Sequence, residues 1–302
     1  MHKTRTPSAA PLQRRPGLQR RELVAALALG GLAGVGDALA QTELSDLARI
    51  RERGVLKVAV YKDNAPFSDG PVADMQGLDV ALAQALAREL QLKLALLPFD
   101  AGENMNDDLR NMVWKGHYLG YGPADLLLQV PVDRYLMQEN RQVLIFAPYM
   151  RQVPVLLHDT RTLPQVRQPE DLQQARLTVE RGAGAASALL GYGGGLLRTR
   201  INILDSGLHA AQAVLAGQAD AAYVLRAQAE AALFRLPAGE RHWALTALDL
   251  PASSAKGWPV GMAIKSQYKE LGMALESAMQ HLRSSGEMLA LFQQNGLTLT
   301  AP

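Results

Sequence analysis

The sequence predicts a mixed α/β protein made of two lobes. Apolar segments rich in β-branched residues alternate with helical repeats over residues 55–130, and the same alternation returns over residues 177–224. Such alternation is typical of βαβ units with a parallel sheet, so two separate sets indicate two lobes. The length of 302 residues, with 48% hydrophobic and 20% charged residues, is sufficient for about two domains.

The first set of elements opens with a helix over residues 44–53, which Gly54 ends because glycine tolerates the left-handed conformation of a helix cap. A strand at 55–61 follows and stops before Pro66, which cannot donate to a sheet. Leucines every four residues predict a helix over 78–90, and alternating leucines predict a strand over 92–96. A short helix is then expected at 106–115, with strands at 125–130, 143–146 and 153–157.

The second set starts after a polar connection over residues 158–174. Strands are expected at 177–179, 201–204, 220–224 and 260–264, and helices at 183–190, 208–216, 268–282 and 287–294. Ser284 and Glu287 have the spacing of a capping box and predict the start of the last helix.

Residues 1–40 have the pattern of a signal peptide. Basic residues precede the apolar run 23–36, and Ala38 and Ala40 provide a small-residue cleavage site. A 14-residue helix is about 21 Å long, which is shorter than a hydrocarbon core of about 30 Å. Cleavage after Ala40 and a periplasmic mature protein are therefore expected, and Arg20-Arg21 leaves both twin-arginine and general export open.

The charge balance argues against nucleic acid as a partner. Residues 1–40 contain six Lys/Arg and two Asp/Glu, which leaves 25 basic and 27 acidic residues in the rest of the chain. That remainder has no basic excess with which to bind phosphates. The chain has no cysteine, so disulfides, thiolate catalysis and cysteine-ligated metal sites are excluded.

Two patterns that resemble cofactor or metal sites have simpler interpretations. Gly182-x-Gly184-x-x-Ser187 imitates a dinucleotide fingerprint, but the strand before it is short and charged at both ends, whereas the first strand of such a domain is buried throughout. No metal-ligand spacing connects the acidic residues and histidine of segment 103–117. We therefore expect no cofactor and no metal.

Six short motifs stand in the order seen in a known family. They cover residues 51–58, 64–67, 76–80, 146–149, 215–221 and 261–265. In this arrangement the chain resembles the bacterial extracellular solute-binding proteins of family 3. The resemblance implies a periplasmic binding protein-like type II fold, in which two α/β lobes are joined by two hinge strands, near 149–153 and 257–260, and close around a small ligand. Lobe 1 would then comprise residues 41–150 plus 259–302, and lobe 2 residues 151–258.

The resemblance also implies ligand-binding positions. Arg134 is the candidate for binding a ligand carboxylate, although the Thr that usually precedes this Arg is absent. Leu225 occupies the position at which amino-acid receptors have an acidic residue for the ligand ammonium, which argues against an ordinary α-amino acid because an unpaired buried ammonium is costly. The turn Gly182, Ala183 and Gly184 lacks the usual Thr and leaves backbone N–H groups for an anion.

Three further residues are expected to face the ligand because they lie at or after strand ends. Tyr61 and Asn64 follow the first strand, and Gln129 lies near the end of the strand over 125–130. Pockets in α/β proteins lie preferentially at such ends.

Residues 125–131 and 148–151 resemble the accessory branch associated with quinoprotein (PQQ) dehydrogenases, including the methanol dehydrogenase accessory protein. This resemblance implies a non-enzymatic protein whose partner is a PQQ-dependent dehydrogenase, with the loop 107–123 as a contact surface. One alternative is the receptor of an amino-acid ABC importer, with a permease as partner. Another is an exported lyase of the dehydratase type on the same fold. We expect no stable membrane insertion in any of these cases.

Overall fold

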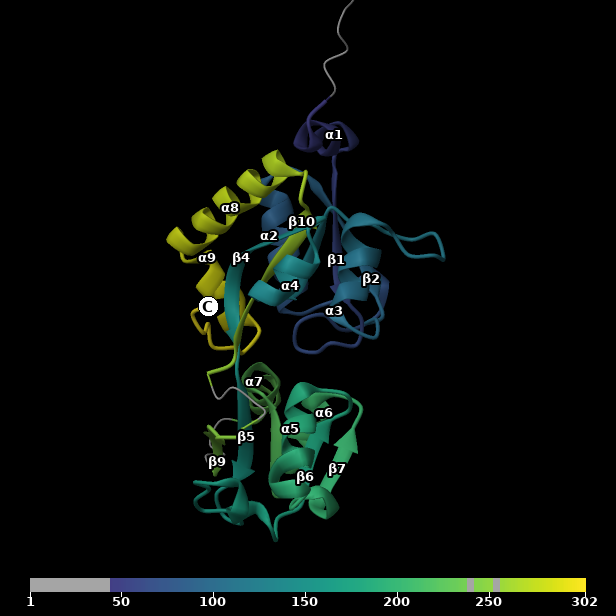
Figure 1. Cartoon of the computed structure of the whole chain (residues 1–302). Coiled ribbons are helices and arrows are strands. Elements are labelled where there is room, and N and C mark those ends of the chain that lie inside the picture. Colours follow the sequence, from purple (N-terminus) through teal and green to yellow (C-terminus); the bar gives the residue numbers. More distant parts are fainter. Residues whose placement is uncertain (1–43, 238–241, 252–255) are drawn as a thin grey trace, which may run out of the picture. The chain divides into compact units, whose positions relative to one another are not determined.

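The computed structural model describes residues 44–237, 242–251 and 256–302. The predicted signal peptide lies outside the described residues. The chain forms two five-stranded sheets, each packed with helices (Figure 1). We call the part with the first sheet lobe 1 and the part with the second sheet lobe 2.

Lobe 1 begins with α1, which Ser45 caps by accepting the backbone N–H of Ala48, and which ends at Gly54 in the left-handed conformation (φ 69°). Its strands are β1 (Val55–Tyr61), β2 (Lys93–Phe99), β3 (Leu126–Pro131), β4 (Val143–Gln152) and β10 (Trp258–Lys265). Its helices are α1 (Asp46–Arg53), α2 (Leu78–Glu89), α3 (Met105–Leu109) with a π turn at Arg110–Trp114, α4 (Arg134–Glu139), α8 (Lys269–Ser284) and α9 (Glu287–Gln294).

The first sheet has the order β2-β1-β3-β10-β4. β1 is parallel to both β2 and β3, while β10 is antiparallel to β3 and β4. The leucine stripe of α2 covers this sheet, and Leu78, Leu82 and Leu86 are buried together with Leu56 and Val58 of β1. The periodicity of four that predicted this helix is therefore its core face.

Lobe 2 contains the second set of alternating elements. Its strands are β5 (Pro154–Asp159), β6 (Leu177–Glu180), β7 (Ile201–Leu204), β8 (Ala221–Leu225) and β9 (Trp243–Thr246). Its helices are α5 (Gly184–Gly191), α6 (Gly207–Leu215) and α7 (Arg226–Phe234), with short 3-10 turns at Pro169–Leu172, Tyr192–Gly194 and Arg198–Arg200. The sheet order is β7-β6-β8-β5-β9, and β6 is parallel to both β7 and β8.

The chain crosses between the two sheets twice, and both crossings meet at Gln152. The first crossing is Val153, between the end of β4 and the start of β5. The second precedes Trp258, which pairs with Gln152 in the sheet. Gly257 has φ 65°, and a Cβ there would lie 1.8 Å from the carbonyl oxygen of Gln152, so only glycine fits.

The C-terminal segment contacts both lobes near these crossings. The backbone N–H of Thr298 donates to Glu230 Oε2 of α7 (2.8 Å), and the N–H of Arg151 donates to the carbonyl of Thr300 (3.1 Å). Gly296 lies against Phe234, since a Cβ there would lie 2.2 Å from the ring.

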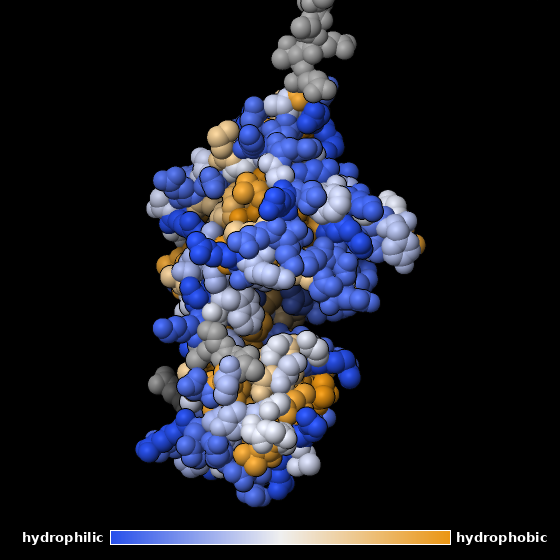
Figure 2. All heavy atoms as spheres, viewed as in Figure 1, coloured by the Kyte–Doolittle hydropathy of each residue, from blue (hydrophilic) through white to orange (hydrophobic). Residues whose placement is uncertain are grey.

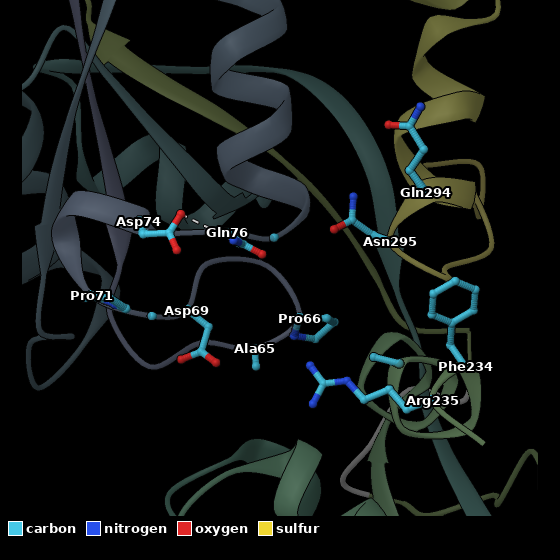
Figure 3. Close-up of a pocket in the computed structure, with 13 residues that line it drawn as sticks. Ala65, Pro66, Asp69, Pro71, Asp74, Gln76, Phe234, Arg235, Gln294 and Asn295 are labelled. Atoms are coloured by element: carbon cyan, nitrogen blue, oxygen red, sulfur yellow. Dashed lines mark hydrogen bonds between the residues drawn. The ribbon is translucent and has the colours of Figure 1, made fainter. Parts of the chain in front are cut away.

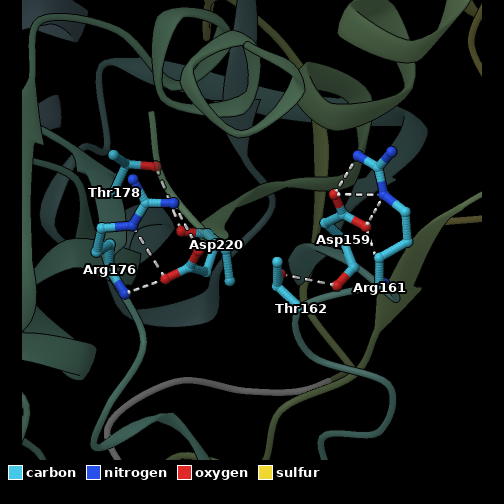
Figure 4. A network of polar contacts seen from close by, with 7 residues as sticks. Asp159, Arg161, Thr162, Arg176, Thr178 and Asp220 are labelled. Atoms are coloured by element: carbon cyan, nitrogen blue, oxygen red, sulfur yellow. Dashed lines mark hydrogen bonds and ion pairs between the residues drawn. The ribbon is translucent and has the colours of Figure 1, made fainter. Parts of the chain in front are cut away.

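Two ion pairs stabilise the edge of the lobe 2 sheet at which β6 and β8 begin (Figure 4). Arg176 donates through two nitrogens and its backbone N–H to Asp220, and these contacts lower the pKa of Asp220. Arg161 likewise lowers the pKa of Asp159 at the end of β5. Because β5 is antiparallel to β8, both pairs lie at the edge opposite the carboxyl ends of β6 and β8.

The structure confirms the predicted fold class and differs from the sequence analysis in a few elements. The segments of α4 and α7 were not predicted as helices. The final helix begins after Gly286 (φ 79°), so the capping box predicted from Ser284 and Glu287 is wrong, and Ser285 Oγ accepts the N–H of Glu287 instead. Glycine takes the cap position because it adopts a positive φ without strain.

Hydrophilic residues cover most of the face in Figure 2, with smaller apolar areas on both lobes. Within the described ranges, no helix is long and apolar enough to cross a bilayer.

Candidate functional site

The sheet order of each lobe defines one position at which a ligand is expected. In an open α/β sheet, ligands bind outside the carboxyl ends of the strands, where the chain leaves neighbouring parallel strands in opposite directions. In lobe 1 this point lies between β1 and β3, and in lobe 2 between β6 and β8. The strand-end residues there are Tyr61 and Pro131 in lobe 1, and Glu180 and Leu225 in lobe 2.

At the lobe 1 position, Tyr61 is held by a buried carboxyl group. Its hydroxyl donates to Asp108 Oδ2 (2.8 Å), and Asp108 Oδ1 accepts the backbone N–H of Gly102 (2.7 Å). Burial raises the pKa of Asp108, and burial beside that carboxyl raises the pKa of Tyr61 well above its usual value. Because the single phenol proton is donated to Asp108, the Tyr61 oxygen can act only as an acceptor towards a ligand. It therefore favours a ligand group that donates a hydrogen bond.

At the lobe 2 position, Glu180 is partly buried and fixed by neutral donors. Gln228 Nε2 donates to Glu180 Oε2 (2.8 Å), and the backbone N–H of Gly207 also donates to this carboxyl. Gln228 Oε1 in turn accepts the N–H of Leu225 (3.0 Å). Burial raises the pKa of Glu180, because no cation compensates for the lost solvent.

Glu180 lies beside the position at which the sequence analysis noted a missing acid. Val179 of β6 pairs with Tyr223 of β8, so the next residue, Glu180, lies next to the end of β8 and Leu225. The carboxylate absent from one strand is thus present at the end of its neighbour. The sequence analysis did not single out Glu180 or its partner Gln228, although a Glu at the end of a strand, two residues before Gly182, was a usable signal.

Close packing over Gly207 maintains this arrangement. A Cβ at Gly207 would lie 2.0 Å from Gln228 Oε1. We expect Gly207→Ala to lower the free energy of unfolding by about 1–3 kcal/mol, since Gln228 would be displaced from Glu180 and Leu225. Urea unfolding measures this loss. Gly191→Ala is the matched control, because no atom lies within 4 Å of its Cβ, and an equal loss in both variants would contradict the prediction.

The predicted anion-binding residues lie at the same edges. Arg134 is exposed at the first position of α4, three residues after the end of β3, and its guanidinium makes no hydrogen bond or ion pair with any described residue. Gly182 (φ 73°), Ala183 and Gly184 form the turn into α5, where Ala183 caps the helix without a side-chain hydrogen bond. The N–H groups of this turn therefore face no capping side chain.

The other two predicted residues are used differently. Asn64 is partly buried in the loop after β1, where its backbone pairs with Ser68. Gln129 is buried, and its amide is occupied by Asp79 and Gln152. Ligand contact by these residues stays a prediction.

A cavity of about 550 Å³ begins at Ala65, next to Asn64, and none of the predicted site residues is among those that line it (Figure 3). It is lined by the loop 65–77 and by the ends of α7 and α9, with Asp69 and Asp74 on the loop and Arg235 extending from the end of α7. Among the described residues, no group of three His, Asp or Glu side chains is placed to hold a metal ion.

The comparisons with known proteins agree with this fold. No family model matches the chain. An ancestral cationic amino acid solute-binding protein has a TM-score of 0.64 at 22% identity, over 83% of this chain and 99% of that one. An amino acid ABC transporter substrate-binding protein from Streptococcus pneumoniae, bound to L-arginine, has a TM-score of 0.59 at 20% identity, over 85% of this chain and 100% of that one. The chain therefore has the type II fold of amino-acid solute-binding proteins.

A curated relative shares more sequence over a shorter stretch. Cyclohexadienyl dehydratase from Pseudomonas aeruginosa is 33% identical over 162 residues, which is 49% of this chain and 53% of the dehydratase. The match thus spans about half of that enzyme's length. An ancestral amino-acid-binding protein described as a precursor of cyclohexadienyl dehydratase is also similar in structure, with a TM-score of 0.57 at 21% identity over 83% of this chain and 98% of that one.

These relatives correct two expectations. The prediction of a protein without enzymatic activity is contradicted, because the curated relative is an enzyme. The predicted association with quinoprotein dehydrogenases has no support among these relatives, which are amino-acid-binding proteins and a dehydratase.

Proposed function

We propose that this protein binds an amino acid between its two lobes in the periplasm, as the receptor of an amino-acid ABC importer. An α-amino acid needs an anion for its ammonium and a cation or N–H cluster for its carboxylate. Glu180 supplies the anion in lobe 2, while Arg134 and the turn at Gly182–Gly184 supply donors. Glu180 carries the proposal, because it replaces the acid whose absence at position 225 argued against such a ligand.

The relatives support the same ligand class. The Streptococcus pneumoniae protein is bound to L-arginine, and the first ancestral protein is described as binding cationic amino acids. The Tyr61 oxygen and the Glu180 carboxylate both accept hydrogen bonds, which suits a ligand with several N–H donors. An ABC permease is the corresponding partner, and the PQQ-dependent dehydrogenase suggested by sequence resemblance is not retained.

Isothermal titration calorimetry of the mature protein with each standard amino acid, beginning with L-arginine, L-lysine, L-glutamine and L-glutamate, tests this function. Binding with a dissociation constant in the micromolar range or tighter is the expected result for at least one of them. Absence of heat from every standard amino acid would exclude the receptor function.

A dehydratase acting on a cyclohexadienyl compound is the second candidate, and the 33% identity to such an enzyme favours it. Loss of water from a hydroxylated cyclohexadienyl ring breaks a C–O bond, whose leaving hydroxyl group takes a proton from a donor, and a ring C–H bond, whose electron pair forms the new double bond while its proton passes to solvent. Glu180 can serve as that donor, because burial raises its pKa and so keeps the protonated form populated at higher pH than for an exposed glutamate.

The two candidates predict opposite responses to pH. A receptor needs the ionised carboxylate of Glu180, so its affinity for an amino acid should increase as pH rises through the raised pKa. A dehydratase needs the protonated carboxyl, so its turnover should fall over the same range. Turnover is measured by the ultraviolet absorbance of the aromatic product, and a rate that is unchanged in Glu180→Gln would exclude this catalytic role.

A further inference from the structure

A buried chain of hydrogen bonds connects α2 to the crossings between the lobes. Asp79, the second residue of α2, is 1% exposed. Its Oδ1 atom accepts from Tyr149 Oη (3.0 Å) and from Gln129 Nε2 (3.1 Å). Gln129 Oε1 then accepts from Gln152 Nε2 (2.8 Å). Gln152 is the last residue of β4, where both crossings meet.

The negative charge of Asp79 determines which group donates and which accepts in each of these hydrogen bonds. A carboxylate can only accept hydrogen bonds, so Gln129 must turn its Nε2 towards Asp79 and its Oε1 towards Gln152. Gln152 must then turn its own Nε2 towards Gln129. As a result, Gln152 Oε1 is buried without a hydrogen-bond partner, an unfavourable position for a polar atom.

The backbone around Gln129 is fixed. The hydrogen bonds can therefore rearrange only through rotation of the side-chain amides. Gln129 has φ 60°, a rare conformation for a residue other than glycine. Its backbone N–H donates to Tyr149 Oη (3.1 Å), which holds that conformation. The amides of Gln129 and Gln152 can exchange their oxygen and nitrogen ends by side-chain rotation alone.

Within the described part of the chain, no charged side chain is placed to fix the ionisation of Asp79. Tyr149 from β4 faces it directly, and Tyr61 from β1 lies within electrostatic range. On the helices packed against α2, His281 and Glu287 pair with Glu89 and Arg88 at the opposite end of α2, and Arg283 donates to the carbonyl of Pro148. Burial raises the pKa of Asp79 to about 7. Both charge states are therefore accessible near neutral pH.

We propose that proton uptake by Asp79 reverses the hydrogen-bond chain through Gln129 and Gln152 and thereby changes the preferred conformation of the hinge. A protonated Asp79, having taken its proton from solvent, donates to Gln129 Oε1. Gln129 then turns its Nε2 towards Gln152, whose Oε1 gains the donor that it lacks. The Gln152 side chain, at the junction of both crossings, thus changes from a donor to Gln129 into an acceptor from it, and its Nε2 takes the position that Oε1 held.

Pulsed EPR between spin labels on the two lobes tests this inference. The natural chain contains no cysteine, so cysteines placed at the exposed positions Lys93 of β2 and Asn202 of β7 carry the only labels. In the unsubstituted background, we expect the ratio of the populated distances to change by roughly threefold or more between pH 5.5 and 8.5, with a midpoint near 7.

Two variants and a control distinguish the mechanism. Asp79→Asn should make the distances independent of pH. Gln152→Leu should also make the distances independent of pH, although Asp79 still titrates in this variant. The pH dependence of its unfolding shows whether Asp79 titrates. This variant therefore tests the proposal even if Asp79→Asn does not fold. The exposed control Asp205→Asn should keep the response. The proposal would be overturned if the distances did not change with pH in the unsubstituted background. It would also be overturned if they changed with pH in Gln152→Leu as much as in that background.

Discussion

Asp79→Asn should make the protein more stable at pH 8, by up to roughly 4 kcal/mol, and leave its stability nearly unchanged at pH 4. Burial raises the pKa of Asp79 from 3.8 to about 7, so the folded protein binds this proton more tightly than the unfolded chain does. The resulting stabilisation is fully present below about pH 4 and is lost as pH rises through about 7. Asparagine never ionises and so avoids this loss.

The substitution also preserves the local hydrogen bonds. Both donors to Asp79, Tyr149 and Gln129, bind the same atom, Oδ1. The amide oxygen of asparagine accepts both bonds, so Tyr149 and Gln129 keep their acceptor, while the Nδ2 group takes the place of Oδ2.

Urea unfolding of both proteins at several pH values between 4 and 8.5 measures this difference. Asp205→Asn, which removes an exposed carboxylate paired with Arg181, is the control and should show no comparable dependence on pH. A variant that is less stable than the natural protein at pH 8 would show that Asp79 is not a buried, unpaired charge.

Glu180→Gln should weaken amino-acid binding by about 100-fold. A charge-assisted hydrogen bond in a partly buried site contributes about 1.5–3 kcal/mol, and 2.7 kcal/mol corresponds to this factor. Glutamine has the same size, and its Oε1 atom still accepts from Gln228 Nε2. The fold of lobe 2 is therefore preserved while the charge is removed.

Calorimetry with the amino acid that the natural protein binds most tightly measures the change in affinity. Glu170→Gln is the matched control, because Glu170 is an exposed glutamate of lobe 2 that accepts a hydrogen bond from Tyr192. Equal affinities of the natural protein and Glu180→Gln would remove the observation on which the receptor function depends. Loss of binding in the Glu170 variant as well would indicate a general electrostatic effect of lobe 2.

The fold was predictable because its signals are local. The leucine stripe of α2, the β-branched residues of β1 and the glycine at position 54 each define an element within a few residues. α7 was missed because β8 continues into it without a breaker at Leu225–Arg226. α4 was missed because its start depends on Asp133, whose side chain accepts the N–H of Leu136.

The site was less predictable because its chemistry depends on long-range pairing. Glu180 and Leu225 are far apart in the sequence and become neighbours only through the parallel pairing of β6 with β8. Asp79 has the sequence pattern of an ordinary acid in the first turn of a helix, and only its burial in the folded protein raises its pKa. Tyr61 was singled out because it ends a strand, a feature that the local pattern does record, and its contact with a ligand stays a prediction.

The contacts of the C-terminal segment have a practical consequence for work with this protein. Thr298 and Thr300 are hydrogen-bonded to residues on either side of the crossings, so this segment is part of the junction between the two lobes. A reporter domain or affinity tag fused after Pro302 would be attached next to these hydrogen bonds. Insertion into the exposed turn after β2 or after α5 would leave the hydrogen bonds of Thr298 and Thr300 intact.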